Sequence, residues 1–238
     1  MSFPLFYIEE FLQGSSGIIL NGDTSKHIVH VLRMKPGEQL RLTNGKGEII
    51  TAEIILENKK ATEVKALSTS NIKHPASKIN IAISLIKNNS RFEWFLEKAT
   101  EIGVSNIIPL ICERTEKQHF RYDRMKAILI SAMLQSQQTW LPILNEPVKF
   151  KEFIKQPSHQ QKYIAHCIDE EKKLLSNEAL HAGEQSILIG PEGDFTKDEV
   201  DAALQNNFIP VSLGSTRLRT ETAGIVACVL LNATKMPR

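Results

Sequence analysis

The first seventy residues alternate apolar and polar positions over short distances, which is the period typical of half-buried strands. Three such runs predict strands at residues 39–43, 48–56 and 62–67. Residues 44–47, Asn-Gly-Lys-Gly, lie between the first two runs and supply glycines where a tight hairpin needs positive φ. Ahead of these strands, residues 27–37 predict one short amphipathic helix that ends at a Pro-Gly pair. The pattern favours a small β-barrel with a helical lid.

Beyond a polar linker at residues 71–78, short apolar runs alternate with amphipathic segments. This alternation is typical of a mostly parallel sheet covered by helices on both faces, so the predicted fold class is α/β. We expect strands at 79–86, 107–111, 163–167, 186–190 and 208–213. We expect helices at 92–102, 125–138, 170–181 and 196–206, and a last helix that ends near Ala233. The chain then divides into a barrel domain at 1–70 and an α/β domain at 79–238.

The last helix is apolar on nearly every side. One stripe consists of Ile225, Val226, Val229, Leu230 and Ala233, and most of the remaining positions are also apolar. A helix of this kind is either buried or packed against a second subunit.

The composition of the chain serves mainly to exclude classes of protein. The chain has 29 basic and 27 acidic residues, a net charge of +2, which permits RNA binding without indicating it. Its three cysteines never form a C-x-x-C pair, which argues against a disulfide framework and a zinc site and favours a reducing cytosol. No secretory signal is visible, and the longest apolar run, residues 224–231, is too short to cross a bilayer. We therefore expect a cytoplasmic protein that does not act in a membrane.

The usual nucleotide fingerprints are missing. Neither G-x-G-x-x-G nor G-x-x-x-x-G-K-[ST] occurs, which disfavours dinucleotide binding, P-loop chemistry and a Rossmann-type methyltransferase. His27 and His30 have no third ligand nearby, so we expect no metal site.

Two glycine-containing loops are expected at the carboxyl ends of adjacent strands, where open α/β sheets bind ligands. Residues 189–195 read Ile-Gly-Pro-Glu-Gly-Asp-Phe, and residues 213–223 read Leu-Gly-Ser-Thr-Arg-Leu-Arg-Thr-Glu-Thr-Ala. Either loop alone is also what a strand-to-helix turn with solvated charges looks like. The two together predict one binding site.

These loops resemble the paired signatures of the ribosomal small-subunit methyltransferase E family. The resemblance extends to residues 27–37, to 98–103 and to the Pro-Leu and Glu-Arg pairs at 109–114, and it covers nearly the whole chain. It implies a SPOUT-type α/β domain with a trefoil knot, preceded by a PUA-like β-barrel that binds RNA. It also implies a homodimer whose sites are completed near the subunit interface. The chain departs from the family pattern at residues 135–138, which lack an arginine, and at Asp194.

The activity implied by this resemblance is methylation of N3 of one uridine in bacterial 16S rRNA, number 1498 in reference numbering, with S-adenosylmethionine as methyl donor. The substrate would be free rRNA or the small ribosomal subunit. Three alternatives stay open: a non-catalytic RNA-binding or ribosome assembly factor, a SPOUT methyltransferase acting on another RNA, and a small-molecule α/β enzyme.

Within that implied mechanism, Arg219 is expected to stabilise the anionic uracil through paired hydrogen bonds. Glu192 is expected to hold Arg219, and Glu221 to accept the proton or orient another group; a plain salt bridge explains both carboxylates equally well. The expected cofactor-binding residues are Pro109, Leu110, Leu188, Ile189, Gly190, Glu192, Gly193, Leu213, Gly214 and Leu218. The expected RNA-binding residues are Arg33, Lys35, Arg91, Arg114 and Arg217.

Overall fold

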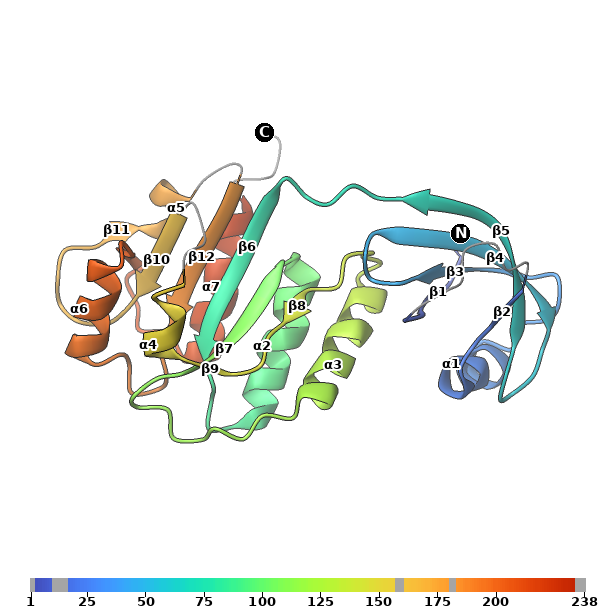
Figure 1. The fold of residues 1–238 in the computed structure, drawn as a ribbon, viewed down its shortest axis with the longest axis horizontal. Coiled ribbons are helices and arrows are strands. Elements are labelled where there is room, and N and C mark those ends of the chain that lie inside the picture. The colour runs from blue at the N-terminus through green and yellow to red at the C-terminus, as the bar shows by residue number, and fades with distance from the viewer. Residues whose placement is uncertain (1–2, 10–16, 157–160, 180–182, 234–238) are drawn as a thin grey trace. The chain divides into compact units, whose positions relative to one another are not determined.

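The computed structural model describes residues 3–9, 17–156, 161–179 and 183–233 (Figure 1). Contacts divide the chain into two compact units. The first runs to His74 and also includes Met133–Leu141, and the second consists of Pro75–Ala132 and the chain from Pro142 onward. The first unit thus takes a segment from the middle of the chain, which the sequence pattern assigns to the α/β domain.

The first unit is built on a five-stranded sheet with the order β1-β3-β4-β5-β2. Its strands are β1 (Leu5–Tyr7), β2 (Ile18–Ile19), β3 (Gln39–Thr43), β4 (Glu48–Leu56) and β5 (Glu63–Asn71). Alternate positions point into one core, including Leu40, Leu42, Ile50, Ala52 and Ile54. The predicted bounds of β3 and β4 are confirmed, whereas β5 extends four residues beyond the prediction and β1 and β2 were not expected.

The hairpin between β3 and β4 has the predicted glycine geometry. Gly45 and Gly47 have φ values of 69° and 85°. A Cβ at Gly47 would also overlap the ring of Trp140, so this glycine is needed for close packing as well as for the turn.

The prediction of a single helix over residues 27–37 is wrong. The helical segment starts earlier, as α1 (Gly22–Lys26), and continues as a π-helical turn at His27–Val31. Asn21 caps it, because its side chain accepts a hydrogen bond from the Thr24 N–H at 2.9 Å. The helical turns end before Arg33, whose φ is 55°.

The second unit is built on an eight-stranded sheet. Every described strand pairing in it is parallel, as the alternation of apolar runs and amphipathic segments predicts. The order is β11-β13-β10-β12-β6-β7-β8, with β9 also paired to β7. The strands are β6 (Ser77–Ser84), β7 (Asn106–Ile111), β8 (Ile143–Leu144), β9 (Val148–Lys149), β10 (Gln161–Ala165), β11 (Lys173–Leu174), β12 (Gly183–Ile189) and β13 (Ile209–Ser212).

Helices cover both faces of this sheet (Figure 1). The short α4 (Phe150–Phe153) and α6 (Lys197–Gln205) lie on one face, and α2 (Asn89–Ile102) and α7 (Thr220–Ala233) lie on the other. The remaining helices are α3 (Tyr122–Gln135) and α5 (Leu175–Glu178). The helix predicted at 170–181 is wrong in its described part, because Lys173–Leu174 pairs with β13 and leaves only the short α5; its expected end at His181 lies outside the described residues.

One glycine ends α2, and another allows α7 to pack closely against it. Gly103 has a φ of 91° and ends the helix as predicted, because its N–H bonds the Ala99 and Thr100 carbonyls. Gly224 lies in α7, and a Cβ there would be 2.6 Å from the Phe95 ring and 3.0 Å from Ile83. The absence of a side chain at Gly224 therefore lets α7 pack closely against both α2 and the sheet.

Candidate functional site

The candidate site lies where three neighbouring strands end. β10 is flanked by β12 on one side and β13 on the other, and all three are parallel. The two glycine-containing loops were expected after adjacent strands, and this is wrong, because β10 lies between β12 and β13. Strand order is set by long-range pairing that local patterns do not encode. The loop that follows β10 therefore forms a third part of the site.

Two adjoining cavities open between these loops, with volumes of about 320 and 400 Å³. The first is lined by Ile189, Gly190, Pro191, Glu192, Asp194 and residues 217–220. The second is lined by residues 211–218 together with His166 and Lys172. Both share Ala165, Cys167, Arg217, Leu218 and Ala223, so the two loops singled out in the sequence do meet around common space.

Asp194 joins the loop after β12 to the loop after β10. Its φ is 62°, and its carboxylate accepts hydrogen bonds from the backbone N–H groups of Cys167 at 2.8 Å and Phe195 at 2.9 Å. Sequence reasoning assigns no role to this departure from the family pattern. The structure shows that it positions the backbone of both loops.

The segment after β7 also holds the loop after β12 in place. Arg114 donates from Nη1 to the Gly193 carbonyl at 2.7 Å. The buried carboxylate of Glu199 accepts from the N–H of Glu113 at 2.8 Å and from the N–H of Thr196 at 2.9 Å, within the predicted capping box that opens α6. Sequence reasoning found the capping box but not the link to Glu113, because that link spans 86 residues.

The glycines of the first loop make room for protein side chains. A Cβ at Gly190 would lie 3.1 Å from the ring of Phe195, and one at Gly193 would lie 3.3 Å from the Arg114 side chain. Gly214 differs, because its φ is 144° and a Cβ added there would meet no described atom within 4 Å. Thr220 links the two loops by donating from its hydroxyl to the Gly190 carbonyl at 3.0 Å.

His166 was not anticipated from the sequence. It directly follows β10, is 7% exposed and lines the second cavity. Neither of its ring nitrogens has a hydrogen-bond partner among the described residues. Burial lowers the pKa of this imidazole, and nearby Lys172 lowers it further, against opposing effects of Asp194 and Glu170.

The three residues expected to be catalytic differ in their surroundings. Arg219 lines the first cavity, and its guanidinium forms no hydrogen bond or ion pair with a described residue. Glu192 accepts a hydrogen bond from the Lys87 N–H at 3.1 Å, and its expected pairing with Arg219 is not found in the described part of the chain. Glu221 is 6% exposed, with Oε1 3.7 Å from Nε of Arg91 and Oε2 without a described hydrogen-bond partner.

The structure brings together some of the expected cofactor-binding residues. Those that line one of the two cavities are Ile189, Gly190, Glu192, Leu213, Gly214 and Leu218. Leu188 is fully buried in the core, and Gly193 is held by Arg114. Pro109 and Leu110 were expected in a loop that closes the site, and this is wrong, because both lie inside β7, paired with β6.

The expected RNA-binding residues are dispersed. Arg217 is exposed beside both cavities, and Arg114 braces the first loop. Arg91 is the partner of Glu221. Arg33 and Lys35 belong to the first unit, where Lys35 pairs with Glu57 at 3.2 Å.

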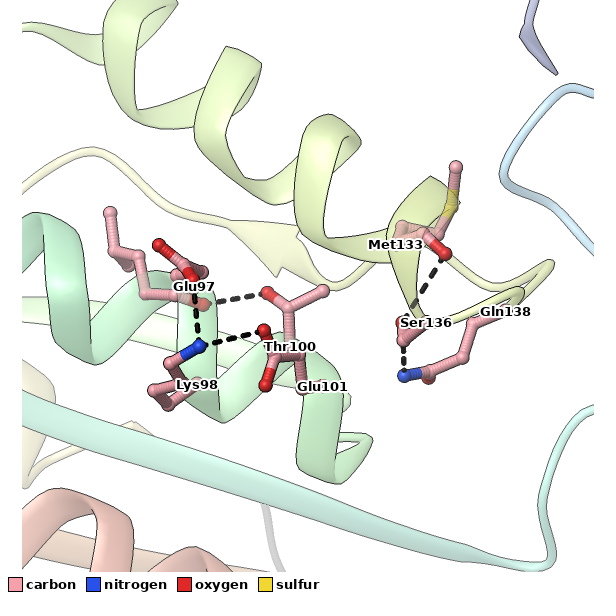
Figure 2. Close-up of polar contacts among 8 residues, drawn as sticks. Glu97, Lys98, Thr100, Glu101, Met133, Ser136 and Gln138 are labelled. Carbon is pink, nitrogen blue, oxygen red and sulfur yellow. Dashed lines mark hydrogen bonds and ion pairs between the residues drawn. The ribbon is translucent and has the colours of Figure 1, made fainter. Parts of the chain in front are cut away.

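Two further segments named by the sequence make local polar contacts (Figure 2). Lys98 on α2 lies 2.7 Å from Glu97 and 3.0 Å from Glu101. At the end of α3, the Gln138 amide donates to the Ser136 hydroxyl at 2.9 Å. Gln137 accepts a hydrogen bond from Arg41 at 2.6 Å, so this departure from the family pattern makes its contact within the first unit.

Within the described ranges, no cluster of three or more His, Cys, Asp or Glu side chains is placed to hold a metal ion. Of the helices that the structure describes, none has the length and apolar character needed to span a membrane.

Comparison with known proteins gives the class first. A family model described as an RNA methyltransferase domain matches residues 73–232, and one described as an RNA methyltransferase PUA domain matches residues 20–67. The fold is therefore that of RNA methyltransferases that carry an N-terminal PUA domain. The predicted fold class, a SPOUT-type α/β domain after a small PUA-like domain, is confirmed.

Individual relatives identify the family. The ribosomal RNA small subunit methyltransferase E of Rickettsia conorii is 30% identical over 95% of this chain and 94% of its own. A probable rRNA methyltransferase from Porphyromonas gingivalis superposes with a TM-score of 0.91 at 36% identity, covering 98% of both chains. The Neisseria gonorrhoeae methyltransferase E, solved with S-adenosylmethionine bound, gives a TM-score of 0.86 at 31% identity over 97% of both chains. The chain belongs to the ribosomal RNA small subunit methyltransferase E family.

Proposed function

We propose that this protein transfers a methyl group from S-adenosylmethionine to N3 of a uridine in 16S rRNA, the nucleotide numbered 1498 in reference numbering. The observation that carries the proposal is the meeting of the loops after β12 and β13 around common space, with the Arg219 guanidinium, unpaired among the described residues, in its wall. The Rickettsia relative, a ribosomal RNA small subunit methyltransferase E, and the S-adenosylmethionine bound to the Neisseria protein support methylation of small-subunit rRNA with this methyl donor.

The residues present fit the cofactor. The two cavities join apolar walls, such as Ile189 and Leu218, to exposed backbone at Gly214 and to a buried imidazole whose nitrogens lack partners in the described chain. Such a mixture of apolar surface and a few unsatisfied polar groups is typical of small-molecule sites. When bound there, the cofactor supplies an electrophilic methyl group on a sulfonium.

The protein must orient the uracil and stabilise the negative charge that N3 deprotonation spreads onto O2 and O4. Arg219 suits this role, because its guanidinium, without a partner among the described residues, can donate two parallel hydrogen bonds to one side of the base. Thr220 and Asp194 hold the loops in fixed positions, so little reorganisation is needed when charge develops. Glu221 acts on Arg91 and positions it, since it does not line either cavity.

We infer that the protein acts in the cytoplasm on rRNA or the small ribosomal subunit, with Arg33, Lys35 and Arg217 among its phosphate contacts. We also infer that it is a homodimer that uses the apolar face of α7, where Val229 is 46% exposed. Light scattering should give the mass of two chains, and Val229→Glu should shift it to one chain.

Primer extension on rRNA tests the proposed reaction, because a methyl group on the pairing edge of uracil stops reverse transcriptase. Unmodified free 16S rRNA and unmodified small subunits are each incubated with the protein and S-adenosylmethionine. A new stop beside one uridine in either sample supports the proposal and identifies the preferred substrate. RNA binding without a stop in both samples would contradict it and support a non-catalytic factor.

A further inference from the structure

His166 is an unusual part of the cavity wall. Buried polar groups in proteins are nearly always hydrogen-bonded, yet this side chain is 93% buried and leaves both nitrogens without a partner among the described residues. A neutral imidazole carries one donor and one acceptor. A group that is unsatisfied in the free protein and lines a cavity is available to hydrogen-bond a ligand in that cavity.

Burial is the largest influence that keeps the ring neutral, and the charge of Lys172 adds to it. Lys172 donates from Nζ to the backbone carbonyls of His166 and Ile168, which holds a positive charge close to the imidazole. Asp194 and Glu170 act in the opposite direction, and Arg217 lines the same cavity. The balance lowers the pKa of the imidazole, so the ring is uncharged near pH 7.

A neutral ring suits this ligand. The methyl donor carries a sulfonium, and a charged imidazolium beside it would add like-charge repulsion. The apolar neighbours in the second cavity, Val211, Leu213 and Leu218, suit the faces of a nucleoside, which leaves its polar edge to meet the imidazole.

We propose that His166 binds the cofactor, with its neutral imidazole forming a hydrogen bond to the adenosyl group. This assignment rests on the function proposed above. It gives the loop after β10 a direct part in binding and not only a structural one.

Calorimetric titration with S-adenosylhomocysteine, the demethylated product, tests the assignment. His166→Leu should weaken binding about tenfold, which corresponds to loss of one net hydrogen bond. The melting temperature of the free variant should stay equal or rise, because the substitution removes two buried nitrogens that no described residue satisfies. His166→Asn, which retains a donor and an acceptor, should recover part of the affinity. His119→Leu, which changes an exposed histidine, is the matched control and should bind normally.

Two measurements would not respond to a merely structural role. The ring nitrogen resonances of His166, assigned by their loss in His166→Leu, should shift when the product binds. As the pH falls through the lowered pKa of His166, binding of the sulfonium form should weaken more than binding of the product, which lacks the sulfonium charge, and His166→Leu should remove that difference.

These experiments distinguish failure of the His166 assignment from failure of the proposed function. Unchanged His166 resonances at saturation, or affinity within twofold of wild type in His166→Leu, would overturn the assignment and leave the proposed function standing. If the wild-type protein bound neither form of the cofactor, the proposed function would fail and the assignment with it.

Discussion

The hydroxyl of Thr220 donates to the carbonyl of Gly190 at 3.0 Å, which ties the start of α7 to the end of β12. Thr220 is 4% exposed, so the bond is sheltered from water. It fixes the spacing of the loops that line the first cavity, and Arg219 is the residue directly before it.

Thr220→Val should lower the free energy of unfolding by about 1–3 kcal/mol, because it keeps the shape of the side chain but leaves the Gly190 carbonyl without its donor. Urea unfolding measures the change. Thr220→Ser, which keeps the hydroxyl, should lie close to wild type. A loss in Thr220→Ser with wild-type stability in Thr220→Val would show that the methyl group matters and the hydrogen bond does not.

Gly190→Ala should destabilise the protein because its Cβ meets the ring of Phe195. Phe195→Leu removes that ring, so the double variant should be more stable than the two single effects predict when added. A coupling of about 0.5–3 kcal/mol in a double-mutant cycle is expected. Additive effects would mean that the added Cβ destabilises the protein through another atom, such as the Phe195 backbone nitrogen, which it would approach to 3.2 Å.

Arg219→Ala should lower kcat by about 100-fold or more, as expected when a donor to developing negative charge is removed. Binding of S-adenosylhomocysteine should change by less than about twofold, because the guanidinium is assigned to the uracil. Single-turnover kinetics and calorimetry measure the two quantities. Lys197→Ala, an exposed charge on α6, is the control. Near-normal turnover in Arg219→Ala would remove this residue from the mechanism.

Cys167 offers a natural reporter of the site. It is exposed and lines both cavities, whereas Cys112 and Cys228 are buried. Burial raises the pKa of the Cys112 thiol to about 12, which keeps it protonated and unreactive. Iodoacetamide should therefore modify Cys167 first, and saturating S-adenosylhomocysteine should slow that reaction. Peptide mass spectrometry gives the rates, and unslowed modification would place the ligand elsewhere.

Acid should destabilise the protein through His166. Its pKa lies below the ordinary 6.5, so as the pH falls below that value the unfolded chain takes up a proton that the folded protein does not. Stability is then lost as the pH falls, by up to about 1.4 kcal/mol per pH unit from this group. His166→Leu should gain stability relative to wild type between pH 7.5 and 5.5 in chemical unfolding. A constant difference across that range would contradict the depressed pKa.

Local patterns were sufficient for much of the fold. The Gly45 and Gly47 turn, the capping box at Thr196 and the Gly103 helix end are all set by interactions within a few residues, and each appears as predicted. Errors fall where distant contacts decide. Residues 173–174 form a strand because β13 pairs with them, although their sequence reads as helix.

The candidate site divides in the same way. The loops at 190–194 and 213–219 could be found from the sequence because glycine, proline and charge occur together there. His166 could not, because a single histidine after a short strand carries no signal until the strand order places it between those loops. Arg114 is among the predicted site residues, but its bond to Gly193 depends on folding across 79 residues.

The contact between Gly224 and Phe95 has a consequence for genetic screens. α7 begins immediately after Arg219, so the packing of this helix against α2 determines where the guanidinium is carried. Any side chain introduced at Gly224 would push the helix outward and move Arg219 with it, although every group in the cavity wall would keep its chemical identity. Inactivating substitutions recovered at Gly224 should therefore be interpreted as displacement of Arg219 by a new side chain between α7 and α2, and not as loss of a group that takes part in the reaction.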